Sequence, residues 1–404
     1  MPEGVRRVRP RPRSAAVILT VLGGSAFSTP VLSQSLERAF ADEPLVVRLV
    51  GRNIERVGAV ARACRLTAVV ERVAVEEYGW PERTRAISGA DVVLIQVRPG
   101  GYAGRAFDET FPLPYGLPGD EGLGPGGLAS AWRGWPVVKE IVADARAHNP
   151  RAPIVLLSSP LGLLVRLAGP GVIGVCELPW TTLRQICGDD DRASRAAFDY
   201  YGVNHLGWIY NLDADGRERD ARLWPLRYVR LHDEQADVVA EQTRLPAARV
   251  HRLAAIARAS FAAFTSADRA GIQRALGERT AEWYPDAVVP LLSALRGRPV
   301  GIPLFLTRAD EGEIRERCYR ASDGRLHACA PATPPPAAVE DIVSRFVGYE
   351  QLAAQAVDAA SEELAVEALA IHPWVRSRDD AAALARAVVT QRSGEGACLD
   401  FASL

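Results

Sequence analysis

The sequence lacks several features that define particular protein classes. It has no apolar run approaching the about 18 residues that a membrane-spanning helix requires, which argues against an integral membrane protein. Its 404 residues carry a formal net charge of -1, without the basic excess typical of nucleic-acid-binding proteins. We therefore expect neither a membrane nor a nucleic acid as a partner. Lysine is almost absent, with Lys139 the only one, which indicates a compositional bias rather than a functional feature.

Cysteine is also scarce and shows no disulfide or metal-binding spacing. The 6 cysteines form no Cys-x-x-Cys pair, and a chain of this length does not need a disulfide framework. We expect a reduced, cytoplasmic protein. All cysteines except Cys176 are interpreted as ordinary thiols without partners: Cys64, Cys187, Cys318, Cys329 and Cys398.

The beginning of the sequence resembles an export signal, because an arginine-rich segment precedes the apolar run Ala15–Leu22. The same run is also typical of a short buried strand that enters a glycine turn, with a helix beginning near Thr29-Pro30. We favour the strand, since this run is at the short end for a signal peptide. Residues 1–14 are then expected to form a disordered basic arm.

Strand-like and helix-like patterns alternate over the first half of the chain. β-branched runs of strand length are separated by segments with helical spacing, which predicts parallel βαβ units and a doubly wound sheet. The expected strands lie at residues 15–22, 44–53, 91–97, 152–160 and 172–176, with residues 54–73 helical.

Past about residue 195 the alternation fades, and two alanine-rich blocks at 233–276 and 339–389 have helical spacing. The predicted fold class is α/β, with an N-terminal Rossmann-like doubly wound parallel sheet and a C-terminal mixed, mostly helical α+β domain. We expect a dinucleotide-binding domain at 15–195. Residues 196–404 would carry the substrate, metal and oligomerisation functions.

The glycine turn Gly23-Gly24-Ser25 follows the first expected strand. Such a turn lets a phosphate approach backbone N–H groups at a helix N-terminus, although a plain strand-to-helix turn also uses glycine. The second strand ends at Gly51-Arg52, without the acidic residue that holds a ribose hydroxyl. Because Arg52 could pair with a 2′-phosphate, both NAD and NADP remain open.

The segment Val97–Pro136 holds ten glycines and six prolines in forty residues, which predicts one long loop. Long loops at the carboxyl end of a strand are often functional, while a covering loop with surface salt bridges is the alternative. Its candidate residues are Arg98, Arg105, Asp108, Glu109 and Glu121.

Cys176 follows an expected strand, and His205 lies in a separate segment, Tyr201–Trp208. A thiolate and an imidazole can share one divalent metal and leave positions open for substrate oxygens. A buried cysteine is nevertheless more often a core residue than a ligand. Both interpretations therefore stay open on these two residues alone.

A series of motifs, in order, gives the sequence a family resemblance. The motifs are GGSxxxTP, GADVVLIQVRPGG, RxxDE, PYGLPGDE, WRGWP, VCELP, GVNHLGW, WPLRY and ALAIHPWV. In order and spacing the sequence resembles family 4 glycoside hydrolases of the 6-phospho-glucosidase type, from about residue 15 to about residue 390. The resemblance implies that bound NAD oxidises the sugar at C3, a base removes the C2 proton, and the C1 substituent is eliminated.

The resemblance also implies roles for individual residues. Mn²⁺ or a similar divalent ion would be held by Cys176 and His205, and Tyr228 would be the base. Asp108 and Glu109 are further catalytic candidates, with a structural arginine–carboxylate pair as the alternative. The cofactor residues would be Gly23, Gly24, Ser25, Arg52 and Arg98, and the substrate residues Arg105, Glu121, Ser159, Glu177 and Asn204.

The departures from the family pattern bear on the substrate. Leu22 stands where the family's glycine triplet begins, Ser159 replaces the asparagine before Pro160, and Glu177 replaces the asparagine after the cysteine. Extra carboxylates would repel a phosphate, so we expect a neutral or cationic sugar rather than a 6-phospho sugar.

Three functions remain open. They are a divergent family 4 glycosidase, a non-hydrolytic sugar oxidoreductase, epimerase or dehydratase, and a non-catalytic relative that has lost NAD binding. The partners would be a small-molecule sugar or glycoside and further copies of the chain, as a dimer or tetramer.

Overall fold

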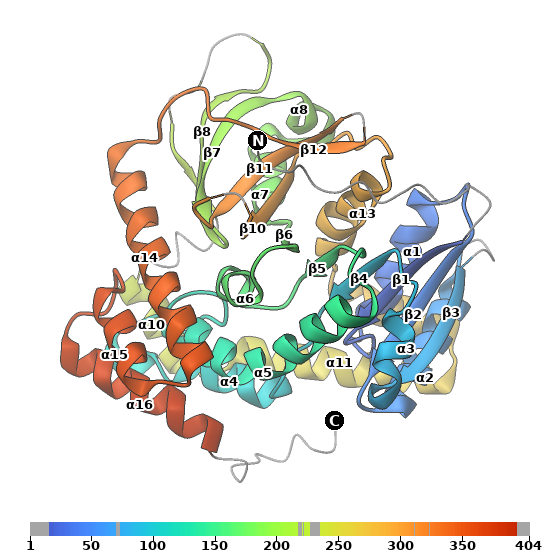
Figure 1. The fold of residues 1–404 in the computed structure, drawn as a ribbon, viewed down its shortest axis with the longest axis horizontal. Helices are drawn as coiled ribbons and strands as arrows, with labels where there is room; N and C mark the ends of the chain where they lie inside the picture. The colour runs from blue at the N-terminus through green and yellow to red at the C-terminus, as the bar shows by residue number, and fades with distance from the viewer. Residues whose placement is uncertain are drawn as a thin grey trace.

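A computed structural model describes residues 16–69, 73–216, 220, 222–226, 235–310, 312–322 and 324–393. The expected arm at 1–14 lies outside these residues, as does Tyr228. The described chain forms one twelve-stranded mixed sheet with helices on both faces (Figure 1). None of the described helices is long and apolar enough to cross a membrane.

One half of the sheet is parallel, in the order β3-β2-β1-β4-β5-β6. Its strands are β1 (Val17–Leu22), β2 (Leu45–Gly51), β3 (Val73–Gly79), β4 (Val92–Ile95), β5 (Ile154–Leu156) and β6 (Val172–Cys176). The predicted α/β class and the strand within Ala15–Leu22 are confirmed. Strand β3 was not predicted, because this edge strand is only half buried and carries the polar pair Glu76-Glu77.

The parallel strands are apolar on both faces because each face packs against helices. Successive side chains of a strand point to opposite sides, and in β4 Val92 and Leu94 join one core while Val93 and Ile95 join the other. The first core is covered by α1 (Thr29–Ala39), α2 (Ile54–Thr67) and α13 (Val289–Leu295). The second is covered by α3 (Arg83–Ile87), α5 (Gly124–His148) and α6 (Leu161–Ala168).

The prediction of one long loop at Val97–Pro136 is wrong. Most of this segment is helical, as α4 (Gly101–Thr110) and the first half of α5, with Pro136 inside α5. Its glycines serve close packing: a Cβ on Gly126 would lie 2.1 Å from the Asp120 carbonyl oxygen. The glycine and proline content therefore indicated a loop, whereas the structure uses these residues where two helices approach each other closely.

The other half of the sheet is antiparallel and continues directly from β6. Its strands are β7 (Ala197–Val203), β8 (Leu206–Asp213), β9 (Trp224–Pro225), β10 (Leu304–Arg308), β11 (Glu316–Ser322) and β12 (Arg325–Ala328). β10 pairs with β6, and the order continues β11-β7-β8-β9 with β12 beside β11. Cys318 and Cys329 are free thiols, as expected, and the Cys318 thiol donates a hydrogen bond to the Cys329 sulfur at 3.5 Å.

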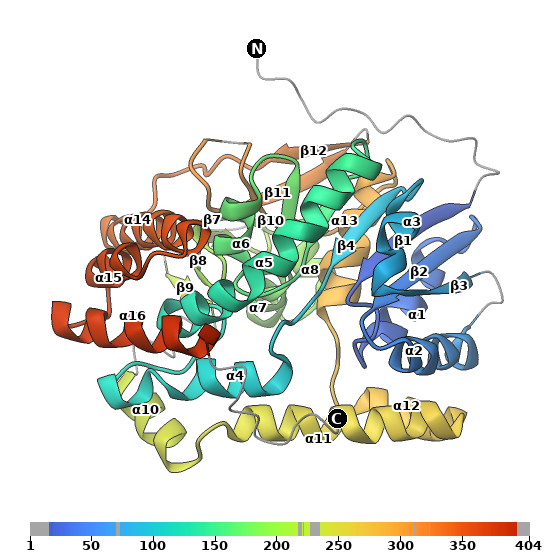
Figure 2. The same cartoon turned by 60° about the horizontal axis from the view of Figure 1, so that its bottom comes forward.

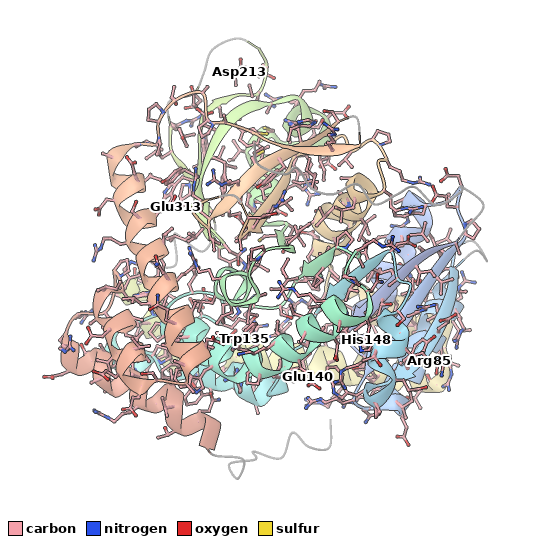
Figure 3. All side chains as sticks on the ribbon, viewed as in Figure 1. Arg85, Trp135, Glu140, His148, Asp213 and Glu313 are labelled. Carbon is pink, nitrogen blue, oxygen red and sulfur yellow. The ribbon has the colours of Figure 1, made fainter. Side chains whose placement is uncertain are left out.

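The expected helical blocks are confirmed. The remaining helices are α7 (Leu178–Cys187), α8 (Asp190–Arg195), α10 (Gln235–Arg244), α11 (Ala248–Ser266), α12 (Arg269–Gly277), α14 (Ala337–Ala359), α15 (Glu362–Ile371) and α16 (Arg378–Ser393). Helix α11 packs against both α2 and α4 (Figure 2). Trp135 of α5 faces the C-terminal helices, where its indole nitrogen donates to Asp358 of α14 at 3.0 Å (Figure 3).

A buried ion pair joins the two halves of the chain. Arg166 of α6 contacts Glu350 of α14 at 3.0 Å and also donates to the Ile314 carbonyl oxygen. Both charged side chains are 8% exposed, and burial raises the pKa of Glu350. Removing one partner of such a pair leaves a buried charge without compensation.

We expect Arg166→Met to lower the free energy of unfolding by about 3–5 kcal/mol, because Glu350 would stay buried without its cation. The loss should shrink as the pH falls, since a protonated Glu350 needs no cation. Urea unfolding at two pH values measures both effects. The exposed pair Lys139–Asp358 provides the control: Lys139→Met should change stability by less than about 1 kcal/mol, and an equal loss in both variants would contradict the prediction.

Candidate active site

A cavity of about 1150 Å³ lies at the carboxyl ends of the parallel strands. Its lining includes the segments that follow β1, β2, β4, β5 and β6. The strand order reverses between β1 and β4, which is where open α/β sheets bind their ligands. The volume exceeds the about 300–1000 Å³ typical of a pocket for one small molecule, so it offers room for a dinucleotide and a sugar together.

The glycine turn after β1 forms one end of this cavity. Gly23 has φ +91°, a conformation that favours glycine. Gln96, just after β4, braces the turn by donating to the Gly23 carbonyl oxygen at 3.2 Å and to Thr29 at 3.1 Å. Tyr284 donates to the Gln96 side chain at 2.8 Å, so a residue distant in sequence holds this brace.

The turn leads into α1, whose first turn contains no acidic residue and whose N-cap, Ser28, makes no side-chain cap. The N–H groups of Thr29 and Val31 already donate to the Ala26 and Ser28 carbonyl oxygens, and Pro30 has none, so an anion such as a pyrophosphate would meet the backbone of the turn that precedes α1. Arg52, exposed after β2, lines the same end of the cavity together with Ser25. Gly24 does not line the cavity; a Cβ there would lie 2.8 Å from Leu49.

Buried charges of α4 and the segment before α5 form a network at the middle of the cavity. Arg105, 3% exposed, contacts Glu109 at 2.8 Å and Glu121 at 3.1 Å, and Arg98 also pairs with Glu121. Burial would raise the pKa of Glu121, but Arg98 and Arg105 outweigh it and lower this pKa to about 2. Glu121 is therefore an anion whose charge is already compensated.

Asp108 and Glu109, the two catalytic candidates of α4, do not line the cavity. Asp108 is 1% exposed and accepts from Arg133 of α5 at 3.0 and 2.6 Å. Burial raises the pKa of Asp108 to about 7, against the opposing effect of Arg133. Both carboxylates thus contact arginines, which is the structural alternative that the sequence left open.

Cys176 and His205 both line the cavity, from parts of the sheet that β10 and β11 separate. Cys176 ends β6, while Asn204 and His205 form the two-residue turn between β7 and β8. Burial raises the pKa of the Cys176 thiol well above its usual value and lowers the pKa of His205 to about 4. A Cβ on Gly122 would lie 2.7 Å from the His205 Nδ1, so the adjacent chain fits closely against the imidazole.

These two side chains fit a metal site that uses few protein ligands. A soft sulfur and an imidazole nitrogen are both good ligands for divalent transition metals. Within the described ranges there is no cluster of three or more His, Cys, Asp or Glu side chains able to enclose an ion. The donor set therefore fits an open site completed by water or substrate oxygens, and not a closed structural site.

The cavity lining is strongly basic, which the sequence analysis did not foresee. Seven arginines and three glutamates of the described chain line it. Arg249 and Arg258 come from α11, whose alanine-rich sequence indicated only a helix; Arg279 follows α12. Burial, and then Arg105 and Arg249, lower the pKa of Arg279 to about 10. This excess of positive charge argues against the expected neutral or cationic sugar.

The structure brings together most of the predicted site residues. Those that line the cavity are Gly23, Ser25, Arg52, Arg98, Arg105, Glu121, Ser159, Cys176, Glu177, Asn204 and His205. Glu177, the N-cap of α7, has a pKa raised first by burial and then by Asp286 and Glu282. The lining residues missed from sequence include Gln96, Arg249, Arg258 and Tyr284, which carry no motif of their own.

Comparisons with known proteins agree with this arrangement. The family model described as Family 4 glycosyl hydrolase matches residues 17–188. The chain is 32% identical over 197 residues to 6-phospho-alpha-glucosidase 1 of Lacticaseibacillus paracasei, which covers 46% of this chain and 44% of that protein. It is 27% identical over 335 residues to the 6-phospho-beta-glucosidase BglT of Thermotoga maritima, covering 73% of this chain and 80% of BglT.

The match to maltose-6'-phosphate glucosidase MalH of Clostridium acetobutylicum spans 46% of that relative. As with the Lacticaseibacillus paracasei protein, the chain therefore matches less than half of the relative's length. Solved structures share the whole fold. The Thermotoga maritima 6-phospho-beta glucosidase, solved with NAD and glucose-6-phosphate, has a TM-score of 0.81 at 23% identity and covers 93% of this chain and 98% of that one. Residues 17–188 therefore resemble the family 4 glycosyl hydrolases in sequence, and the chain shares the fold of the solved structures.

Proposed function

We propose that this protein is an NAD- or NADP-dependent enzyme of the family 4 type that acts on a glycoside or modified sugar carrying an anionic group. One observation carries the proposal: the glycine turn, the Cys176–His205 pair and an excess of arginines line a single cavity. Relatives named as acting on 6-phospho-glucosides, and structures solved with NAD and glucose-6-phosphate, support it.

The residues at the glycine turn would bind and orient the dinucleotide. The turn from Gly23 to Ser28, which precedes α1, would receive its pyrophosphate, and Arg52 would face the adenosine ribose. When bound, the nicotinamide would take a hydride from the sugar and later return it. The hydrogen bonds of Gln96 and Tyr284 would keep the turn in one conformation.

Cys176 and His205 would hold the divalent ion, which would polarise the sugar oxygens as a Lewis acid. The imidazole of His205 is neutral at physiological pH, as a metal ligand must be, because burial lowers its pKa to about 4. Ser159 and Glu177 line the same region and would contact the sugar. The base assigned by the family resemblance, Tyr228, lies outside the described residues.

The anionic group of the substrate would lie among the arginines that end the cavity. Arg249 lines the cavity and is close enough to Glu121, His205 and Arg279 to influence the pKa of each, which supports a role near the network and the proposed ligand His205. Because Glu121 is neutralised by Arg98 and Arg105, a phosphate or carboxylate there meets net positive charge.

Family 4 chemistry on such a substrate is tested by product analysis with an aryl 6-phospho-glucoside. A released phenol indicates hydrolysis, whereas an intact glycoside with altered stereochemistry indicates the non-hydrolytic alternative.

The cofactor proposal predicts micromolar binding of NAD⁺ or NADP⁺ to the full chain by calorimetry. If NADP⁺ is preferred, Arg52→Ala should weaken its binding by about 10–100-fold, because a charged hydrogen bond to the 2′-phosphate is lost, and should leave NAD⁺ binding within about threefold. Arg62→Ala, on the same side of the fold but outside the cavity, is the control. Folded protein that binds neither dinucleotide would contradict the proposal and favour a non-catalytic relative.

The metal proposal predicts that Cys176→Ser and His205→Ala each weaken Mn²⁺ binding at least about tenfold, since each removes one of two protein ligands. The electron paramagnetic resonance signal of free Mn²⁺ measures the bound fraction. Cys329→Ser and His251→Ala, which change exposed residues outside the cavity, should bind Mn²⁺ like the unaltered protein. Unchanged binding in all four variants would overturn the assignment of the ligands.

The charge of the cavity predicts that glucose 6-phosphate binds at least about tenfold more tightly than glucose. Arg249→Ala should weaken glucose 6-phosphate binding by about tenfold or more and leave glucose binding unchanged, because only the phosphate needs the cation. Arg252→Ala provides a matched control, since Arg252 is an exposed arginine of α11 that does not line the cavity. Equal binding of both sugars would restore the expectation of a neutral substrate.

A further inference from the structure

Glu316, the first residue of β11, is a carboxylate with no exposed surface. It does not line the cavity, and no sequence motif marked it. Both of its oxygens accept hydrogen bonds, one from the Tyr200 hydroxyl at 2.5 Å and one from the Asn204 side-chain nitrogen at 3.1 Å. Tyr200 and Asn204 belong to the β7–β8 hairpin, so Glu316 holds the end of that hairpin from the neighbouring strand.

The Asn204 amide connects Glu316 to the cavity. Burial raises the pKa of the Cys176 thiol, and the Asn204 side chain is close enough to the sulfur to oppose that effect. An amide nitrogen carries two hydrogens, so the same group can donate both to Glu316 and to the sulfur. Glu316, Asn204 and Cys176 therefore form a chain of contacts that ends at a cavity-lining sulfur.

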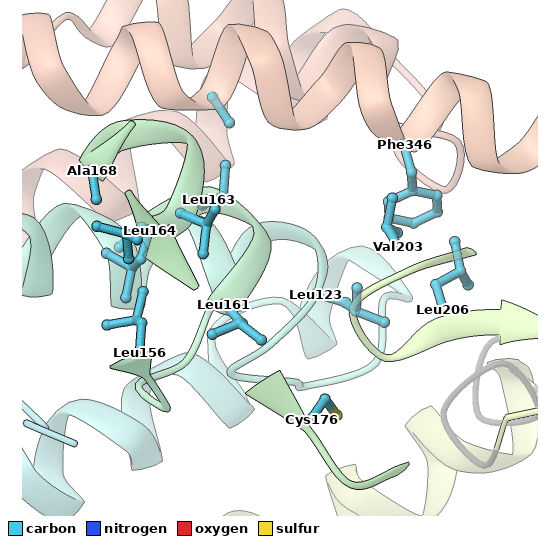
Figure 4. Close-up of a cluster of buried hydrophobic side chains, with 14 of the residues drawn as sticks. Leu123, Leu156, Leu161, Leu163, Leu164, Ala168, Cys176, Val203, Leu206 and Phe346 are labelled. Carbon is cyan, nitrogen blue, oxygen red and sulfur yellow. The ribbon is translucent and has the colours of Figure 1, made fainter. Parts of the chain in front are cut away.

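The same amide fixes the turn that carries His205. Asn204 and His205 are the only two residues between the paired Val203 and Leu206, and His205 has φ +68°. Val203 and Leu206 are anchored in the core, and Phe346 of α14 lies beside Val203 (Figure 4). The hairpin strands are thus held by apolar packing, whereas the polar tip depends on the Asn204–Glu316 contact.

We propose that Glu316 is a positioning residue for a divalent ion bound by Cys176 and His205, acting through the amide of Asn204. This inference rests on the proposed function, because it assumes that these two side chains bind the ion. Residues that hydrogen-bond a metal ligand without contacting the ion typically contribute about 10–100-fold to metal affinity. Glu316 would orient the sulfur of Cys176 through the side chain of Asn204. It would orient the imidazole of His205 through the backbone of the turn that Asn204 and His205 share.

The test compares two substitutions at position 316 by Mn²⁺ titration of the full chain. Glu316→Leu removes both acceptors at similar size and should weaken Mn²⁺ binding about 10–100-fold. Glu316→Gln should keep binding within about threefold, because its carbonyl oxygen can still accept from Asn204 while its nitrogen donates to the Tyr200 oxygen. Glu316→Gln should also show the thiolate-to-Co²⁺ absorption band when loaded with Co²⁺, and Glu316→Leu should not. This result would show that the hydrogen bonds of residue 316, and not its charge, orient the metal ligands.

Asp199→Leu serves as the control for general damage to the hairpin. Asp199 is a buried carboxylate on β7 that accepts from Asn211 and the Ala332 amide, away from the turn. This variant should lower thermal stability and leave Mn²⁺ affinity unchanged. If it loses Mn²⁺ affinity as much as Glu316→Leu does, the effect is general and the inference is overturned.

A second variant keeps the test decisive if Glu316→Leu does not fold. Asn204→Ala retains the Tyr200–Glu316 contact and should show the same 10–100-fold loss. Combining it with Glu316→Leu, where both fold, should cause little further loss, because one chain of contacts is broken twice. If the unaltered protein and Asn204→Ala bind Mn²⁺ equally well, the role of Glu316 is overturned but the proposed metal site is not. Unaltered protein that binds no Mn²⁺ overturns the proposed metal site and this inference together.

Discussion

The pairing of β10 with β6 is the constraint on which the candidate site depends. Phe305 of β10 lies opposite Cys176, the last residue of β6, and this pairing turns a parallel sheet into a mixed one. β11 then pairs with β10, and the β7–β8 hairpin with β11. The backbone ladder therefore brings the Asn204-His205 turn to the end of β6, although the two lie in different parts of the chain. Without that ladder, the sulfur and the imidazole would have no fixed relation.

A second constraint acts through charge. Burial and then the neighbouring arginines lower the pKa of Arg279, and three glutamates offset only part of the repulsion among the seven arginines around the cavity. The arrangement is destabilising for the empty protein, because like charges at close range in a partly buried site are unfavourable. A dinucleotide pyrophosphate and an anionic sugar would relieve it. The cost in stability and the affinity for anions thus have the same physical source.

The parallel half of the fold could be predicted from sequence because its signals are local. Apolar runs of strand length, separated by helices, indicated β1, β2, β4, β5 and β6 and the edge of the sheet where the cavity lies. The same reasoning failed where local composition and tertiary packing disagree. Glycine and proline between 97 and 136 indicated a loop, whereas Gly126 is needed because α5 packs against the Asp120 backbone. Strand β3 was lost because a half-exposed edge strand shows little apolar pattern.

The candidate site divides in the same way. Residues within motifs, such as Gly23, Cys176 and His205, were found because spacing or resemblance marks them. Arg249 and Arg258 were missed because the sequence of an alanine-rich helix does not indicate which of its faces lines a cavity formed by other elements. The charge of the cavity was misjudged for a related reason. Glu177 was counted as an added negative charge in the sequence, but the seven arginines that line the same cavity become visible only in the fold.

Glu316 shows how a site can depend on a residue that makes no contact with its ligands. Its pKa is raised to about 7, first by burial and against the bonds from Tyr200 and Asn204, so the carboxylate is held where its charge is unfavourable. Apolar residues of similar volume commonly stabilise a core as well as buried polar groups do. Packing alone therefore gives no reason for a carboxylate at this position. Its two hydrogen bonds do give one, because they define a single orientation for Asn204, and apolar contacts have no comparable directionality.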